Sequence, residues 1–195
     1  MPKKPRSRDS VLRLVLAAML LALAFVLPFL TGQIPQIGSA LCPMHMPVLL
    51  CGFFCGPWYA AVVGMISPLL RFALLGLPPI LPSGVAMSFE LMAYGLLAGV
   101  VDAALRRRMN KDHRIYAIYL ALFTAMLGGR AVWGITRLLL AGLDTSVFGW
   151  QMFLAGAFVN AMPAVIIQVA VIPPLVLTVE TAFPQMAKTD VKQNK

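Results

Sequence analysis

Long apolar runs, separated by short polar or Gly- and Pro-rich breaks, dominate the pattern along this 195-residue chain. A membrane-spanning helix needs about 20 mostly apolar residues. The runs predict helices over residues of about 11–30, 44–55, 58–75, 84–105, 115–141 and 150–179. The second of these is too short to cross a bilayer core of about 30 Å by itself. The pattern therefore predicts an all-α integral membrane protein, a six-transmembrane-helix bundle.

Composition agrees with a lipid environment. Hydrophobic residues make up 60% of the chain and charged residues 12%, whereas a soluble domain carries about 25% charged residues. So few charged groups cannot cover a water-exposed globule, which excludes the soluble classes. We expect a single membrane domain over residues 11–180, with a basic cytoplasmic tail at 1–10 and a second cytoplasmic tail at 181–195.

Most of the basic charge lies in three short segments. The net charge is +9, from 16 Lys and Arg against 7 Asp and Glu. All but three of the basic residues precede or open the first apolar run, fill the loop at 106–114, or lie in the C-terminal tail. Because the runs between these segments come in pairs, the positive-inside rule places all three segments, and both termini, in the cytoplasm. The basic residues form no stripe with interleaved aromatics, so we expect no nucleic-acid partner.

Three arginines remain inside the predicted spans, namely Arg71, Arg130 and Arg137. Each costs about 2.5–3.5 kcal/mol at the bilayer centre, so each should face a partner, a ligand or water. Together with Glu90 they lie in the outer half of the bundle, where positive charge exceeds negative charge. We hypothesise an outward-facing pocket in which arginines grip the carboxylate or phosphate of an anionic ligand.

Four more residues are candidates for this pocket: His45, Tyr94, Trp133 and Asn160. The two aromatic residues could supply a stacking wall for a ring, or simply pack within the bundle. Asn160 could contact the ligand or make an interhelical hydrogen bond. A purely structural alternative is that Arg71 pairs with Glu90, while Arg137 extends to the membrane interface.

Motifs for catalysis or metal binding are weak. Met44, His45 and Met46 lie near Cys51 and Cys55, but a closed metal site needs three or four converging ligands. No acid pair lies at depth for hydrolysis, and no GxxxxGK[ST] phosphate loop is present. We therefore expect no catalytic site, no metal site and no cofactor in this chain. If ATP drives transport, another chain must bind it.

The whole pattern resembles a substrate-specific (S) component of an energy-coupling-factor (ECF) vitamin transporter. The residues behind the resemblance are the small pair Ala18 and Ala22 in the first helix, HMPVLLCGFFCGPW at 45–58, and GMISPLLR at 64–71. The resemblance implies a vitamin-binding subunit of a bacterial plasma membrane. It also implies partners, namely a transmembrane scaffold (T) subunit, docked through Ala18 and Ala22, and two ABC ATPase subunits that hydrolyse the ATP.

The ligand stays open between several classes. Cobalt- and nickel-specific relatives begin with a Met-His motif whose terminal amine binds metal, whereas Met44-His45 is internal here, which argues against a metal substrate. Pantothenate suits the surplus positive charge, as other acidic vitamins do, and a neutral ring such as pyridoxine or a pyrimidine precursor remains an alternative. Two other functions also remain, a stand-alone ion-coupled carrier and a non-transporting membrane scaffold.

Overall fold

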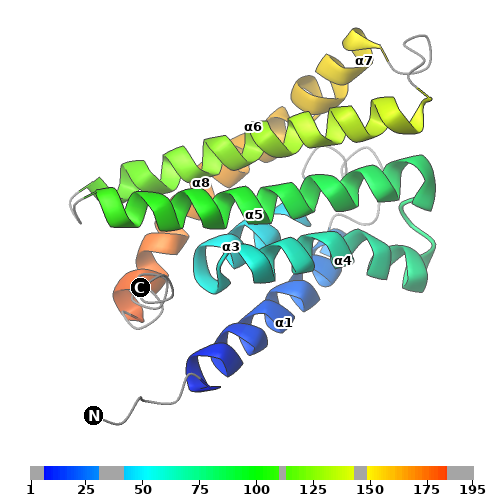
Figure 1. Ribbon diagram of the computed structural model, residues 1–195. Coiled ribbons are helices and arrows are strands. Elements are labelled where there is room, and N and C mark those ends of the chain that lie inside the picture. Colours follow the sequence, from blue (N-terminus) through cyan, green and yellow to red (C-terminus); the bar gives the residue numbers. More distant parts are fainter. Residues whose placement is uncertain (1–6, 31–41, 110–112, 143–148, 184–195) are drawn as a thin grey trace.

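The computed structural model describes residues 7–30, 42–109, 113–142 and 149–183. Within these ranges the chain is helical and contains no strand, so the predicted all-α class is confirmed (Figure 1). The helices in chain order are α1 (Ser7–Leu30), α3 (His45–Cys55), α4 (Pro57–Leu75), η1 (Ile80–Gly84), α5 (Val85–Arg108), α6 (Arg114–Leu140), α7 (Trp150–Leu154), η3 (Ala155–Val159) and α8 (Met162–Ala182).

In the described part of the chain, five helical stretches are long and apolar enough to cross a membrane. They are Ser10–Phe29, Pro57–Leu75, Ile80–Arg108, Arg114–Leu140 and Trp150–Ala182. The remaining predicted span corresponds to α3, whose 11 residues extend about 16 Å, roughly half of a bilayer core. Most of α3 is buried among the other helices. The chain is therefore a multi-pass membrane protein that holds one short helix in its interior.

The long helices run roughly back and forth between two ends of the bundle (Figure 1). α5 and α6 form a long antiparallel hairpin, α3 and α4 pack against α5, and α1 packs across α3 and α4. We call one end the basic end, because the Arg106–Arg108 triplet lies there. At this end α1, α4 and α6 begin, and α3, α5 and α8 finish.

Glycines allow α4 and α5 to approach each other backbone to backbone. A Cβ atom on Gly64 would lie 2.3 Å from the carbonyl oxygen of Leu91, and one on Gly95 would lie 2.6 Å from that of Ala60. Both distances are far below van der Waals contact, so a larger residue would force the helices apart. Such small-residue contacts are typical of helices that associate in lipid, where close packing replaces the hydrophobic driving force.

The last predicted span, 150–179, is expected to be one helix, but in the structure this region is interrupted. The chain forms α7, then the π-helical turn η3, and is interrupted at Asn160 and Ala161 before α8 begins. Pro163 lies in the first turn of α8, where its missing N–H removes no helical hydrogen bond. α8 therefore begins just before Pro163, and the single helix expected over 150–179 is divided at that point.

Candidate functional site

An acidic and a basic side chain pair inside the apolar bundle, between α5 and α6. Arg130 Nη1 donates a hydrogen bond to Glu90 Oε1 at 2.7 Å. Glu90 is 2% exposed and Arg130 is 8% exposed. Each charge compensates the other, and this offsets much of the cost of holding either charge away from water.

His45, the first residue of α3, lies against this ion pair. Its Nε2 atom is 3.4 Å from Glu90 Oε1, and its ring meets the Tyr94 ring edge-on, with the ring centroids 5.0 Å apart. His45 is buried, and neither ring nitrogen has a hydrogen-bond partner among the described residues. Buried polar atoms are normally hydrogen-bonded. His45, Glu90, Tyr94 and Arg130, which we call the polar cluster, therefore hold hydrogen-bonding capacity that the described part of the chain does not use.

The backbone of α6 is shaped to accept Tyr94. A Cβ atom on Gly129 would lie 2.2 Å from Cδ2 of the Tyr94 ring, so only glycine lets the ring rest against α6. Tyr94 follows Glu90 by one helical turn on α5, which places both side chains on the same face. The Gly129-Arg130 dipeptide thus provides both the space for the ring and the cation beside it.

Two sulfur atoms in the residues just before α3 connect the polar cluster to a second arginine. Arg130 Nη2 donates to Cys42 Sγ at 3.8 Å, and Arg71 Nη1 of α4 donates to Met44 Sδ at 3.9 Å. Arg71 is half-buried. The short segment that leads into α3 is therefore contacted by two guanidinium groups, one on α4 and one on α6.

The structure brings together some of the predicted site residues and separates others. Glu90 pairs with Arg130 and not, as in the structural alternative, with Arg71. Trp133 stacks on Phe153 of α7, with ring centroids 6.3 Å apart, and Asn160 is exposed at the break before α8. Arg137 is half-buried further along α6. The polar cluster thus contains four of the eight predicted residues, and Arg71 adjoins it through Met44.

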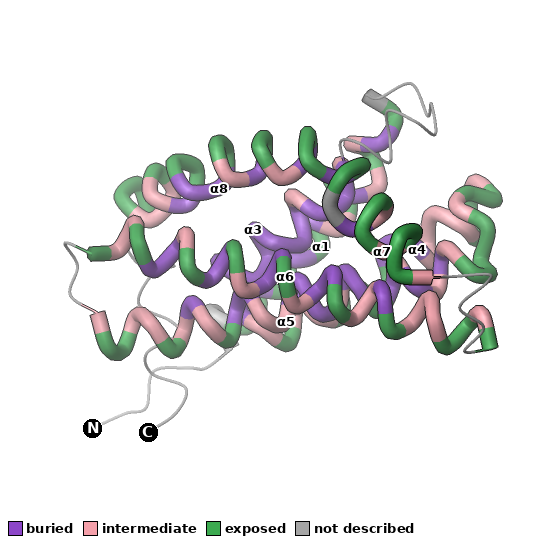
Figure 2. Tube along the Cα trace, turned by 90° about the horizontal axis from the view of Figure 1, so that it is seen from above, coloured by how far each residue is buried: buried purple, intermediate pink, exposed green. Residues whose placement is uncertain are grey.

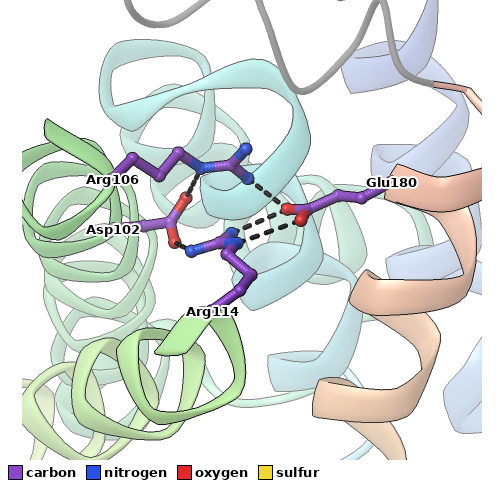
Figure 3. A network of polar contacts seen from close by, with 4 residues as sticks. All are labelled: Asp102, Arg106, Arg114 and Glu180. Atoms are coloured by element: carbon purple, nitrogen blue, oxygen red, sulfur yellow. Dashed lines mark hydrogen bonds and ion pairs between the residues drawn. The ribbon is translucent and has the colours of Figure 1, made fainter. Parts of the chain in front are cut away.

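A second charge network lies at the basic end and was not predicted from the sequence (Figure 3). Asp102 accepts from Arg106 Nε at 2.7 Å and from Arg114 Nη1 at 2.5 Å. Glu180 accepts from Arg114 Nε at 3.0 Å and Nη2 at 2.6 Å, and from Arg106 Nη2. We call these four residues the basic-end network. From the sequence, Arg106 and Arg114 were assigned only to the basic loop at 106–114 that sets the topology. The available signal was that two of the seven acids, Asp102 and Glu180, lie at the ends of apolar runs.

The predicted partner-docking residues lie on the outer side of α1. Ala18 and Ala22 are both exposed, whereas Ala17 and Ala24 are buried against the bundle. Arg13 is also buried, and its Nη1 atom donates to the Cys55 carbonyl at 3.4 Å, which ties α1 to the end of α3. A strip of small side chains on α1 is therefore open to lipid or to another helix.

These features define a class: a multi-pass helical membrane protein with a compensated polar cluster buried in its bundle. Comparison with known families places the chain within that class. The sequence model of the family described as "ECF transporter, substrate-specific component" matches residues 12–176, so the chain belongs to this family. The family is a transporter component and not an enzyme family, which makes the protein a substrate-specific transporter subunit. No curated protein and no solved structure matched the chain.

Proposed function

We propose that this subunit captures a vitamin or related small molecule at the end opposite the basic end and delivers it inward in an ATP-driven ECF transporter. The observation that carries the proposal is the buried polar cluster. Its members come from three helices, α3, α5 and α6, and all of them are buried in the bundle. Ionisable groups inside membrane bundles commonly mark substrate pathways.

The charges of the cluster indicate how a ligand would bind. Arg130 already has Glu90 as its counter-ion, so an acidic ligand would have to compete with Glu90 for it. Arg71 has no acidic partner among the described residues, and it contacts Met44, the residue just before His45. We therefore assign the ligand's acid group to Arg71, with Arg137 as a second candidate. Glu90 would accept from a hydroxyl or amide of the ligand, and Tyr94 would form a wall.

An acidic vitamin of the pantothenate type suits this arrangement, since it combines a carboxylate with hydroxyl and amide groups. The test is thermal stabilisation of the purified protein in nanodiscs by a panel of acidic vitamins and by neutral pyridoxine. Arg71→Gln should weaken binding of the acidic ligand by roughly 10–100-fold, the range expected for hydrogen bonds to charged groups. Arg107→Gln is the matched control, because Arg107 is exposed at the basic end.

Two results of this experiment would contradict the binding assignment. If an acidic vitamin stabilises the wild type and Arg71→Gln equally, Arg71 does not hold the acid. If only pyridoxine stabilises the protein, and Arg71→Gln leaves that effect unchanged, the ligand is neutral and the polar cluster alone binds it.

We assign a T subunit and two ABC ATPase subunits as partners, and the exposed Ala18 and Ala22 as the surface of α1 that docks on the T subunit. Expression with such a module should yield a stable complex, and uptake should stop when ATP is depleted. Recovery of the chain alone, with uptake that persists without ATP and follows an ion gradient, would favour a stand-alone carrier instead. Glu90 would then be its candidate titratable carboxylate, since Asp102, the other buried carboxylate among the described residues, belongs to the basic-end network.

A further inference from the structure

Three residues of the basic-end network come from the α5–α6 hairpin, and the fourth comes from α8. Asp102, Arg106 and Arg114 all belong to the α5–α6 hairpin, and the Asp102 carboxylate holds both guanidinium groups at the same time. These three residues carry one net positive charge. Glu180 is the only member from α8, and its carboxylate makes the network neutral (Figure 3). Removing Glu180 would therefore leave both arginines bound to Asp102, with one positive charge uncompensated.

α8 is otherwise attached along a narrow face. Its buried residues lie on the side toward the bundle, and its outer side is exposed (Figure 2). The buried residues are Ala164, Gln168, Ile172, Pro173 and Val176. After Val176 no residue of α8 is buried, so the ion pairs of Glu180 are the principal attachment of its last turn.

A point of weakness lies just before that turn. Pro173 and Pro174 lie within α8, and neither has an N–H to donate to the preceding turn. The helix there lacks two consecutive backbone hydrogen bonds, which is a common cause of bending in helices. The segment from Leu175 to Ala182 can therefore change its angle at lower cost than an uninterrupted helix.

We propose that the basic-end network is a releasable latch that holds the end of α8 against the α5–α6 hairpin. In the latched state Glu180 binds Arg106 and Arg114, and the basic end is closed between α8 and the hairpin. When Glu180 leaves, the last turn of α8, beyond the buried Val176, swings outward, while Asp102 keeps both arginines ready for Glu180 to return. The use of this movement for substrate release rests on the proposed transport function, whereas the latch itself does not.

The test measures the latch directly, without transport. Spin labels are placed at the exposed positions Tyr116 of α6 and Thr181 of α8 in the full-length protein in nanodiscs, and double electron–electron resonance gives their distance distribution. With Glu180→Gln we expect the longer-distance population to rise roughly tenfold, because three charge-assisted hydrogen bonds to Glu180 are lost or weakened. Glu180→Asp, which keeps the carboxylate, should retain more of the short-distance population than Glu180→Gln does.

Ligand binding and uptake are then measured on the same variants. We expect Glu180→Gln to bind the ligand as the wild type does and to take it up at a changed rate, and we expect Glu180→Asp to take it up at a rate closer to that of the wild type. An unchanged distance distribution in Glu180→Gln overturns the latch. A changed distribution with unchanged uptake overturns its role in release. Failure of the wild type to bind any small molecule would instead refute the proposed function and leave the distance result intact.

Discussion

Removing one member of the Glu90–Arg130 pair should destabilise the protein more than removing both. The perturbations are Glu90→Leu, Arg130→Met and the double variant. Each single change leaves the other charge buried, with a 2% or 8% exposed fraction, and without its 2.7 Å partner. The double change replaces two compensated charges with apolar side chains that suit the surrounding bundle.

The magnitude follows from the geometry. At 2.7 Å and an effective dielectric constant of about 20, opposite unit charges attract by about 6 kcal/mol, and the desolvation of both groups offsets much of this. An uncompensated buried charge costs about 3–5 kcal/mol, whereas an apolar replacement of the whole pair is often neutral or stabilising. On the scale of about 2–4 °C per kcal/mol for chains of this size, the single variants should melt roughly 6–20 °C below the wild type.

The assay is thermal unfolding of the purified protein in detergent, followed by fluorescence, with Arg107→Met as a control that removes an exposed arginine. The double variant should melt within a few degrees of the wild type and well above either single variant. If the melting temperature of the double variant falls by the sum of the two single decreases, the reasoning is refuted. The effects of mutations at independent sites add, whereas those at a coupled charge pair do not.

Two further predictions concern packing. The double variant Ala18→Leu, Ala22→Leu should no longer co-purify with a T subunit but should still bind the ligand. The added side chains prevent close approach of another helix to this exposed face of α1. The control Val26→Leu, at another exposed position of α1, should leave the complex intact. Gly129→Ala should weaken ligand binding by about tenfold, since its Cβ atom would displace the Tyr94 ring and overpacking costs about 1–3 kcal/mol. Titration calorimetry measures this affinity. If the variant binds as tightly as the wild type, Tyr94 is not part of the binding site.

Much of the fold could be predicted because spans are defined by lipid. The run predicted at 84–105 corresponds to α5, and that predicted at 115–141 corresponds to α6, since a long apolar segment in a bilayer has to be helical. The ends were less predictable because tertiary contacts set them. α5 continues to Arg108, past the predicted end, and Arg106 within its last turn bonds both Asp102 and Glu180. The apolar pattern contains no information about Glu180, which is more than 70 residues away.

Half of the predicted site residues lie in the polar cluster, but their pairing could not be predicted. The cost of burying charge identified Glu90 and Arg130, and their positions in the runs placed both in the same half of the bundle. Pairing depends on the rotation of each helix about its axis, which apolar residues on all sides of a membrane helix do not reveal. Arg71 was for that reason as good a partner for Glu90 as Arg130 was. The sulfur atoms of Cys42 and Met44 carried no sequence signal at all, because both residue types are common in apolar cores.

The two charge networks together explain the register of the α5–α6 hairpin. Each contains an acid of α5 bound to an arginine of α6, Glu90 with Arg130 near one end and Asp102 with Arg114 at the other. The acids are separated by about 18 Å along α5 and the arginines by about 24 Å along α6, and long, bendable arginine side chains can absorb the difference. Sliding α6 by one turn in the direction that increases this difference would break the Glu90–Arg130 pair, and no other arginine among the described residues pairs with Glu90. An antiparallel hairpin between two runs whose acids and arginines match in this order is a pairing signal that the sequence does contain.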